Sequence, residues 1–273
     1  MGLDARTGEL RWRLSPAEID PALDGTARVR GPMLSENGIA VVTFRKELTQ
    51  KRVQALYAAG IEAATGRPLW CTLVSSIGSL PWNRGITQAT DGGVITDGVF
   101  YRADRMGLIA AYSIADGRPL WIRRFASELY DSATTAPAYA IGIPVIDGDH
   151  LIALTPDRRQ IVTLDRRSGA LVSTLSSDRL GRPSYLLKVG NLLAGVTETR
   201  VAAIALDGSG PAHLSAAISD SPASVGGPSP IRGRVIVAGD RILIPTARGV
   251  TALGGPDLKT REDLPLDAVG NIV

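Results

Sequence analysis

The chain has 273 residues, 44% of them hydrophobic, and its 30 basic and 27 acidic side chains give a net charge of +3. This charge is too small to indicate a nucleic-acid partner, and no apolar run reaches the ~18 residues of a membrane helix. One cysteine, Cys71, excludes an intrachain disulfide, and two distant histidines argue against a histidine-rich metal centre.

A ten-residue motif recurs along the chain. Its pattern is an acidic residue, then Thr or Ser before Gly, then Trp four positions after the Gly. The anchors of this motif are Asp4, Gly8 and Trp12, then Gly66 and Trp70, then Gly117 and Trp121, then Asp165 and Gly169, and finally Asp207. The acidic side chain can accept hydrogen bonds from a turn backbone, Gly permits positive φ, and Trp can pack against a neighbouring repeat.

Turn dipeptides alternate with this motif. Gly is paired with Asn or Asp at 37–38, 97–98, 147–148, 190–191 and 239–240, each between two apolar runs. Such pairs are the strongest short-range signal for a β-hairpin. Together the two patterns predict four antiparallel strands, A to D, every ~50 residues, which is a β-propeller blade. No segment shows an apolar period of 3.6 residues, so helix should be minor.

The sequence therefore predicts an all-β fold with about five complete blades and partial blades at both ends. The expected bounds are 1–14 for the end of a blade, 15–73, 74–125, 126–175, 176–218 and 219–264 for complete blades, and 265–273 for the start of another. We expect this segment alone to be an open arc that lacks flanking blades and self-associates through uncovered apolar faces.

The repeated Asp-x-x-Thr-Gly-x-x-x-Trp pattern resembles the repeat of pyrroloquinoline-quinone (PQQ)-like β-propellers. That family includes quinoprotein alcohol dehydrogenases and the lipoprotein scaffold of the bacterial outer-membrane assembly machine. WD40 repeats are disfavoured because the chain has no Trp-Asp dipeptide. Kelch repeats are the rival, but the Gly pairs at 92–93, 226–227 and 254–255 fall at unmatched places in the blades.

Quinone chemistry is not expected. The resemblance implies that an enzyme of this family would carry a vicinal Cys-Cys pair and a Glu/Asn/Asp calcium cluster, and the chain has one cysteine and no such cluster. We therefore expect no cofactor, no metal site and no catalytic residue. Cys71 is expected to be a small buried hydrophobe, and the Asp-Arg clusters at 104–105, 157–159 and 165–167 to be solvated pairs.

One end of the predicted propeller has features that are typical of a binding surface. The D–A connections are long and carry aromatic and arginine side chains, which are enriched at binding hot spots, whereas the A–B turns are short. The candidate partner-binding residues are Arg28, Arg30, Trp82, Asn83, Arg84, Tyr130, Asp131, Arg182 and Tyr185. The alternative is that these loops only connect the blades.

The expected function is a non-catalytic scaffold that binds a protein or another polymer. Two alternatives remain: a segment of a PQQ-dependent dehydrogenase, or the sensor part of a larger receptor or kinase. The resemblance implies a periplasmic or other extracytoplasmic location, although this segment carries no signal peptide, because Met1–Arg6 precedes no apolar core.

Overall fold

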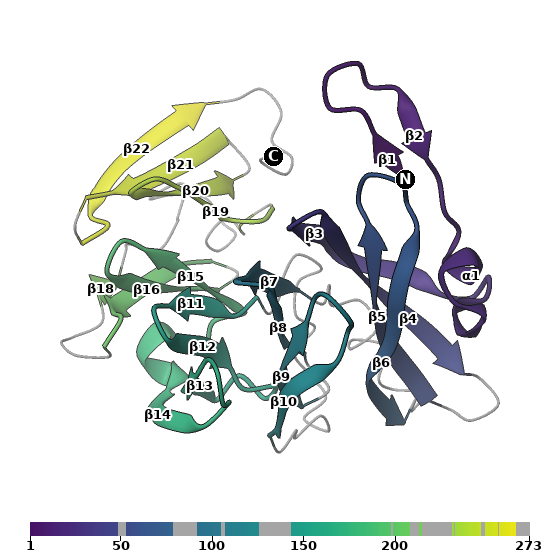
Figure 1. The fold of residues 1–273 in the computed structure, drawn as a ribbon. Coiled ribbons are helices and arrows are strands. Elements are labelled where there is room, and N and C mark those ends of the chain that lie inside the picture. The colour runs from purple at the N-terminus through teal and green to yellow at the C-terminus, as the bar shows by residue number, and fades with distance from the viewer. Residues whose placement is uncertain are drawn as a thin grey trace.

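The fold is a series of small antiparallel sheets arranged around a common centre, as Figure 1 shows for the computed structural model. The structure describes residues 1–48, 53–78, 92–104, 107–125, 143–197, 199–207, 213–214, 231, 233–246, 249–255 and 257–265. Within them, five sheets have four strands each and one has two. The prediction of an all-β propeller with four-stranded blades is therefore confirmed.

We number the sheets as blades 1 to 6 in chain order. Blade 1 contains β1 (Gly2–Leu3) and β2 (Leu10–Trp12). Blade 2 contains β3 (Arg28–Glu36), β4 (Ile39–Leu48), β5 (Val53–Glu62) and β6 (Pro68–Gly78). Blade 3 contains β7 (Gly93–Thr96), β8 (Val99–Ala103), β9 (Leu108–Ser113) and β10 (Pro119–Arg124).

Blade 4 contains β11 (Val145–Asp147), β12 (His150–Leu154), β13 (Gln160–Asp165) and β14 (Leu171–Ser176). Blade 5 contains β15 (Tyr185–Val189), β16 (Leu192–Val196), β17 (Val201–Ala205) and β18 (His213–Leu214). Blade 6 contains β19 (Ile236–Ala238), β20 (Arg241–Thr246), β21 (Gly249–Gly254) and β22 (Thr260–Pro265). The helices of the described chain are single turns: α1 (Pro16–Ile19), η1 (Pro21–Leu23) and η3 (Ser177–Leu180).

Each four-stranded blade pairs its strands in chain order, A to D, and every pairing is antiparallel. The A strands of successive blades contact one another at β3–β7, β11–β15 and β15–β19. The A strands therefore lie toward the centre and the D strands toward the outer rim, as Figure 1 shows.

The hairpin between strands A and B is a two-residue turn in every complete blade. Asn37–Gly38 and Asp97–Gly98 have positive φ at both positions, which defines type I′ turns. In blade 4 the chain reverses at Gly148–Asp149, with Asp147 paired to His150, rather than at Asp147–Gly148 as the sequence suggested. Only the first turn residue, Gly148, then needs positive φ, so the turn belongs to the type II′ class.

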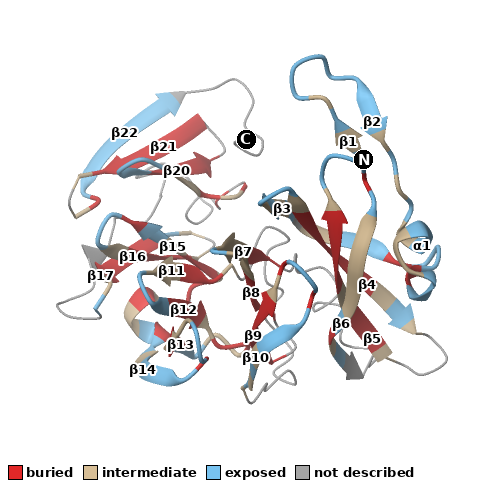
Figure 2. Ribbon diagram, viewed as in Figure 1, coloured by how far each residue is buried: buried red, intermediate tan, exposed pale blue. Residues whose placement is uncertain are grey.

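The hydrophobic core lies between the blades. In β9, Ala110 and Tyr112 pack with Leu56 of blade 2, whereas Ile109 packs with Leu151 of blade 4. Successive residues of a strand point to opposite faces, so a strand buried on both faces supplies apolar residues to two interfaces. Figure 2 shows the result: buried residues concentrate in the middle strands of the blades, and β10, β14 and β22 on the rim are largely exposed.

Candidate functional site

The acidic residue of the repeat organises the turn between strands C and D. Asp4 Oδ1 accepts hydrogen bonds from the backbone N–H groups of Arg6 (2.9 Å) and Thr7 (3.0 Å). Asp165 Oδ1 accepts one from the N–H of Ser168 at 2.8 Å. Hydrogen bonds to the charged form hold the pKa of Asp165 below its ordinary value, with the Ser168 hydroxyl as the largest cause.

The Trp of each motif packs on the glycine of the next blade. The Nε1 of Trp12 donates to the carbonyl oxygen of Ala63 (2.9 Å), that of Trp70 to Ile114 (2.7 Å), and that of Trp121 to Arg166 (2.9 Å). The three rings cover Gly66, Gly117 and Gly169, where an added Cβ would lie 2.6, 2.4 and 2.7 Å from the indole. We call this arrangement the Trp–Gly contact.

The Trp–Gly contact joins blades 1 to 4. In blade 2 the ring is also covered from within its own sheet, because an added Cβ at Gly60 would lie 2.2 Å from Trp70 Nε1. In blade 3, Trp121 of strand D pairs with Ala111 of strand C. At the corresponding position of blade 4, Ser173 of strand D pairs with Thr163 of strand C. The interface from blade 4 to blade 5 therefore lacks this tryptophan.

Several polar contacts between blades lie at the end with the A–B and C–D turns. Glu36 accepts hydrogen bonds from the N–H groups of Asp97 (3.1 Å) and Gly98 (2.6 Å) in the next blade. Asp97 in turn pairs with Arg166 of blade 4 at 2.8 Å. In addition, Lys188 of blade 5 pairs with Asp147 of blade 4 at 2.7 Å. Many polar groups at this end therefore connect neighbouring blades.

The structure divides the candidate binding residues. Trp82, Asn83, Arg84, Tyr130 and Asp131 lie outside the described residues. The other four are described, and they do not all lie in loops as the sequence suggested.

Arg28 and Arg30 are the first and third residues of strand β3. The Arg28 guanidinium donates to the carbonyl oxygens of Gly25 (2.7 Å) and Ala27 (3.1 Å). Arg182 is exposed beside η3, where its guanidinium pairs with Asp178 at 2.6 Å. That pairing lowers the pKa of Asp178 and raises that of Arg182.

Tyr185 corrects the sequence interpretation. It is the first residue of β15 and is only 4% exposed. Its hydroxyl accepts a hydrogen bond from the backbone N–H of Val235 in the stretch that leads into β19, at 3.0 Å. Tyr185 therefore joins blades 5 and 6 and does not lie in an exposed loop. The sequence fits either position, because a tyrosine can be buried with its hydroxyl hydrogen-bonded or can be exposed in a binding loop.

Asp104 is also placed differently from the prediction. It is 5% exposed, and its Oδ2 lies 3.8 Å from Nε of Arg102, which has no exposed area. The Ser75 hydroxyl of blade 2 donates to Asp104 Oδ2 at 2.7 Å. This is a buried polar network between blades and not a solvated surface pair. A neighbouring strand buries it, which the local sequence does not reveal.

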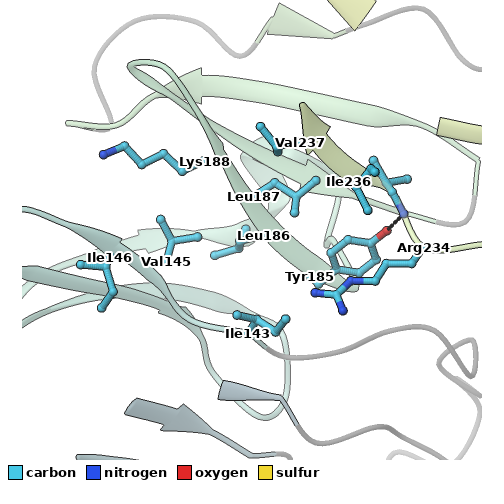
Figure 3. Close-up of a pocket in the computed structure, with 11 residues that line it drawn as sticks. Ile143, Val145, Ile146, Tyr185, Leu186, Leu187, Lys188, Arg234, Ile236 and Val237 are labelled. Carbon is cyan, nitrogen blue, oxygen red and sulfur yellow. Dashed lines mark hydrogen bonds between the residues drawn. The ribbon is translucent and has the colours of Figure 1, made fainter. Parts of the chain in front are cut away.

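A pocket of about 290 Å³ lies along the inner edge of blades 4, 5 and 6, and sequence reasoning missed it. It is built by the A strands β11, β15 and β19 and the residues just before them (Figure 3). Most lining side chains are aliphatic, and the charged ones are Lys188 and Arg234. Its residues come from three blades, each contributing an unremarkable apolar strand. The lining residues are Ile143, Val145, Ile146, Tyr185, Leu186, Leu187, Lys188, Arg234, Val235, Ile236 and Val237.

The described side chains do not fit the calcium–quinone centre that this fold can hold. Among the described residues, no three His, Cys, Asp or Glu side chains are grouped so that they could bind a metal ion. Cys71 lies in β6, and burial raises the pKa of its thiol to about 11, so the thiol is protonated at neutral pH. In the described part of the chain, no helix is long and apolar enough to cross a membrane.

Comparison with solved structures identifies the same architecture. BamB from Moraxella catarrhalis matches with a TM-score of 0.56 and 14% identity over 89% of this chain and 68% of its own. Quinohemoprotein alcohol dehydrogenase from Comamonas testosteroni matches with a TM-score of 0.52 and 12% identity over 92% of this chain and 44% of its own. A europium-containing methanol dehydrogenase matches with a TM-score of 0.51 and 10% identity over 87% of this chain and 52% of its own.

These likenesses are to the fold, and the chain spans about half the length of the two dehydrogenases. Among curated proteins, no sequence matches the chain significantly. The family described as outer membrane protein assembly factor BamB matches residues 54–261, which is most of the chain. The recurrent turn motif, the four-stranded blades and this match agree, and the chain belongs to the BamB family of PQQ-like β-propellers.

Proposed function

We propose that the chain is a non-catalytic scaffold in outer membrane protein assembly, which binds a protein partner at the end of the propeller that carries the D–A connections. The family description supports the process. It also supports a periplasmic location, because outer membrane proteins are assembled from the periplasmic side of the outer membrane. On this proposal the partner is a protein, and nucleic acid is not expected at a net charge of +3.

The observation that carries the proposal is the difference between the two ends of the propeller. At the A–B end, two-residue turns and the contacts of Glu36, Arg166 and Lys188 use polar groups to join blades. At the D–A end the connections are longer, and residues 13–27 and 177–184 each contain a helical turn. Exposed loops on a rigid scaffold are where proteins place binding residues.

Arg182 is the described side chain best placed for such a role. Its side chain is 67% exposed, and the carboxylate of Asp178 that it pairs with is 63% exposed, so a partner can compete for its guanidinium at little desolvation cost. Arg28, at the start of β3, offers a second exposed cation at the same end. Arginines in such positions are frequent anchors in protein interfaces.

The test is capture of partners from native envelope extract by the purified chain. Replacing Arg84, Tyr130 and Arg182 together with Ala should weaken partner binding at least about tenfold. It should change the free energy of unfolding by no more than about 0.5 kcal/mol, since surface loop residues contribute little to the core. Capture unaffected by the triple change would count against the D–A end.

The matched control changes three exposed residues at the opposite end, Arg67, Arg118 and Asp149, to Ala. We expect this variant to keep its partners. If the control loses binding and the loop variant does not, the partner-binding end has been assigned to the wrong face.

A further inference from the structure

The pocket described above lies on the inner surface of the propeller, over strand β15. Tyr185 and Arg234 lie together at one end of it, and Lys188 lies at the other (Figure 3). Three residue steps separate Tyr185 from Lys188, which is about 10 Å along a strand. The pocket is thus a short trough that runs along β15, with β11 and β19 as its walls.

The lining indicates an apolar ligand with a negative charge at one end. The walls are aliphatic, with Val145 and Ile146 on one side and Ile236 and Val237 on the other. The charged lining residues are both cations, and Lys188 already pairs with Asp147 at 2.7 Å. Arg234 has five N–H donors, so it can receive a carboxylate while it contacts neighbours.

The strand edge favours a polypeptide over a lipid. A volume of about 290 Å³ equals roughly ten water molecules, which is enough for a large aliphatic side chain and some of the backbone beside it. Among the described strands, β15 is the inner edge of its sheet and pairs only with β16. An edge strand presents backbone N–H and C=O groups, and an extended peptide can bond to them whereas an acyl chain cannot.

We propose that this pocket binds an extended segment of a partner polypeptide that inserts a large aliphatic side chain between β11 and β19 and sets a neighbouring carboxylate against Arg234. The inference rests on the proposed scaffold function and adds a second contact, on the inner surface, with a stated ligand chemistry. Buried apolar anchors flanked by a charge pair are how interfaces concentrate binding energy.

The test is a titration of the isotopically labelled chain, followed by backbone amide chemical shifts in NMR. The probe is the capped tetrapeptide acetyl-Ala-Leu-Asp-Ala-amide, and its neutral match replaces Asp with Asn. We expect shifts at Leu186, Leu187 and Val237, and affinity about tenfold lower for the neutral peptide, the difference of one charge-assisted hydrogen bond. Arg234→Gln should abolish the preference for the acidic peptide, and Leu187→Asn should weaken both peptides.

Controls come from the rim strand β10, where Ile122 is 50% exposed and Arg124 is also exposed. Ile122→Asn and Arg124→Gln make the same chemical changes away from the pocket and should leave binding unchanged. A thermal melt of each variant separates lost binding from lost folding, and Arg234→Gln tests the carboxylate even if Leu187→Asn unfolds.

The proposal is overturned if the wild-type chain shows no shifts, if the acidic and neutral peptides bind equally, or if Arg234→Gln keeps the preference. Binding of hexanoate without binding of the peptide would overturn the polypeptide as occupant. Because the titration uses a synthetic peptide, a negative result would contradict the proposed pocket ligand but not the proposed scaffold function. A chain that binds the peptide but captures no partner would contradict the scaffold instead.

Discussion

The glycine of the C–D turn meets two requirements at once. Gly117 has a φ of +69° and lies against the indole of Trp70, so neither its backbone nor its surroundings admit a side chain. Gly98, in the A–B turn, has a φ of +73° but nothing within 4 Å. The two glycines therefore separate the cost of the backbone conformation from that of the Trp–Gly contact.

We predict that Gly98→Ala lowers the free energy of unfolding by about 1 kcal/mol, the cost of a left-handed backbone. Gly117→Ala should lower it by roughly 2–4 kcal/mol, because the new methyl group must also displace the Trp70 ring. Denaturant melts of the two variants make the comparison. In the double variant Trp70→Ala/Gly117→Ala the two losses should not add, since the clash is gone. Equal costs at both glycines would show that the ring contributes nothing.

Asp24 gives the chain an acid-sensitive contact near the start of β3. Its Oδ1 accepts hydrogen bonds from the Thr26 hydroxyl (2.7 Å) and N–H (3.1 Å), and Lys46 lies 3.1 Å from Oδ2. These contacts lower its pKa from 3.8 to about 2, with the Thr26 hydroxyl as the largest cause. A depressed pKa means that the stabilisation is present above about pH 4 and is lost as pH falls toward 2.

We therefore expect Asp24→Asn to have a lower melting temperature than the wild-type chain at pH 6. The difference should shrink between about pH 4 and pH 2, because the unfolded carboxyl takes up a proton below about pH 4 whereas the folded one does so only near pH 2. Thr26→Val removes the principal cause and should raise the pKa of Asp24 toward 3.8, which NMR titration of the carboxyl carbon would detect. A melting difference that is constant with pH would contradict this account.

At the scale of whole elements, the blades are joined unequally. Trp12, Trp70 and Trp121 each bond to the next blade, whereas Ser173 stands at the corresponding position of blade 4. Blades 5 and 6 are joined differently, through Tyr185 and an apolar cluster that includes Val196. In repeat proteins each unit contacts only its neighbours, so damage to one interface should remain local.

Trp70→Ala should lower the free energy of unfolding by about 3–5 kcal/mol, as for other large packed aromatics. Hydrogen exchange followed by mass spectrometry should show faster exchange in β5, β6, β9 and β10, on either side of the altered interface. Exchange in β20 and β21 of blade 6 should change much less, because the contacts of Trp70 with Ile114, Gly117 and Gly60 lie in blades 2 and 3. Uniform acceleration across all blades would mean that the propeller opens as a single cooperative unit.

At the scale of the whole molecule, the fold is found both in BamB and in quinone-linked dehydrogenases. Among the described residues, no three His, Cys, Asp or Glu side chains are grouped so that they could bind a metal ion, and burial raises the pKa of the Cys71 thiol to about 11. Fold alone does not decide function, so quinone and calcium binding need a direct test.

We expect calorimetric titration of the purified chain with PQQ, with and without calcium, to show no specific site. The chain has no vicinal cysteine pair, since Cys71 is its one cysteine, and its described residues include no carboxylate cluster that could hold a calcium ion beside a quinone. A site of micromolar affinity or tighter would restore the dehydrogenase-segment hypothesis.

The sequence by itself determined the fold class, because the signals are local. A positive φ at Gly66 or Gly117 and a hairpin at Asn37–Gly38 follow from backbone sterics within a few residues. The period of the motif then implied the propeller and, by resemblance, the family.

Only the tertiary structure decided which polar and aromatic side chains are buried between blades. Tyr185 and Asp104 are buried by strands from neighbouring blades, and the pocket over β15 combines residues more than 90 positions apart, Ile143 and Val237 among them. Burial of this kind depends on which elements meet across an interface between blades. A local pattern of apolar and polar residues does not reveal which elements contact each other, because the same strand pattern occurs in a core, an interface or a pocket wall.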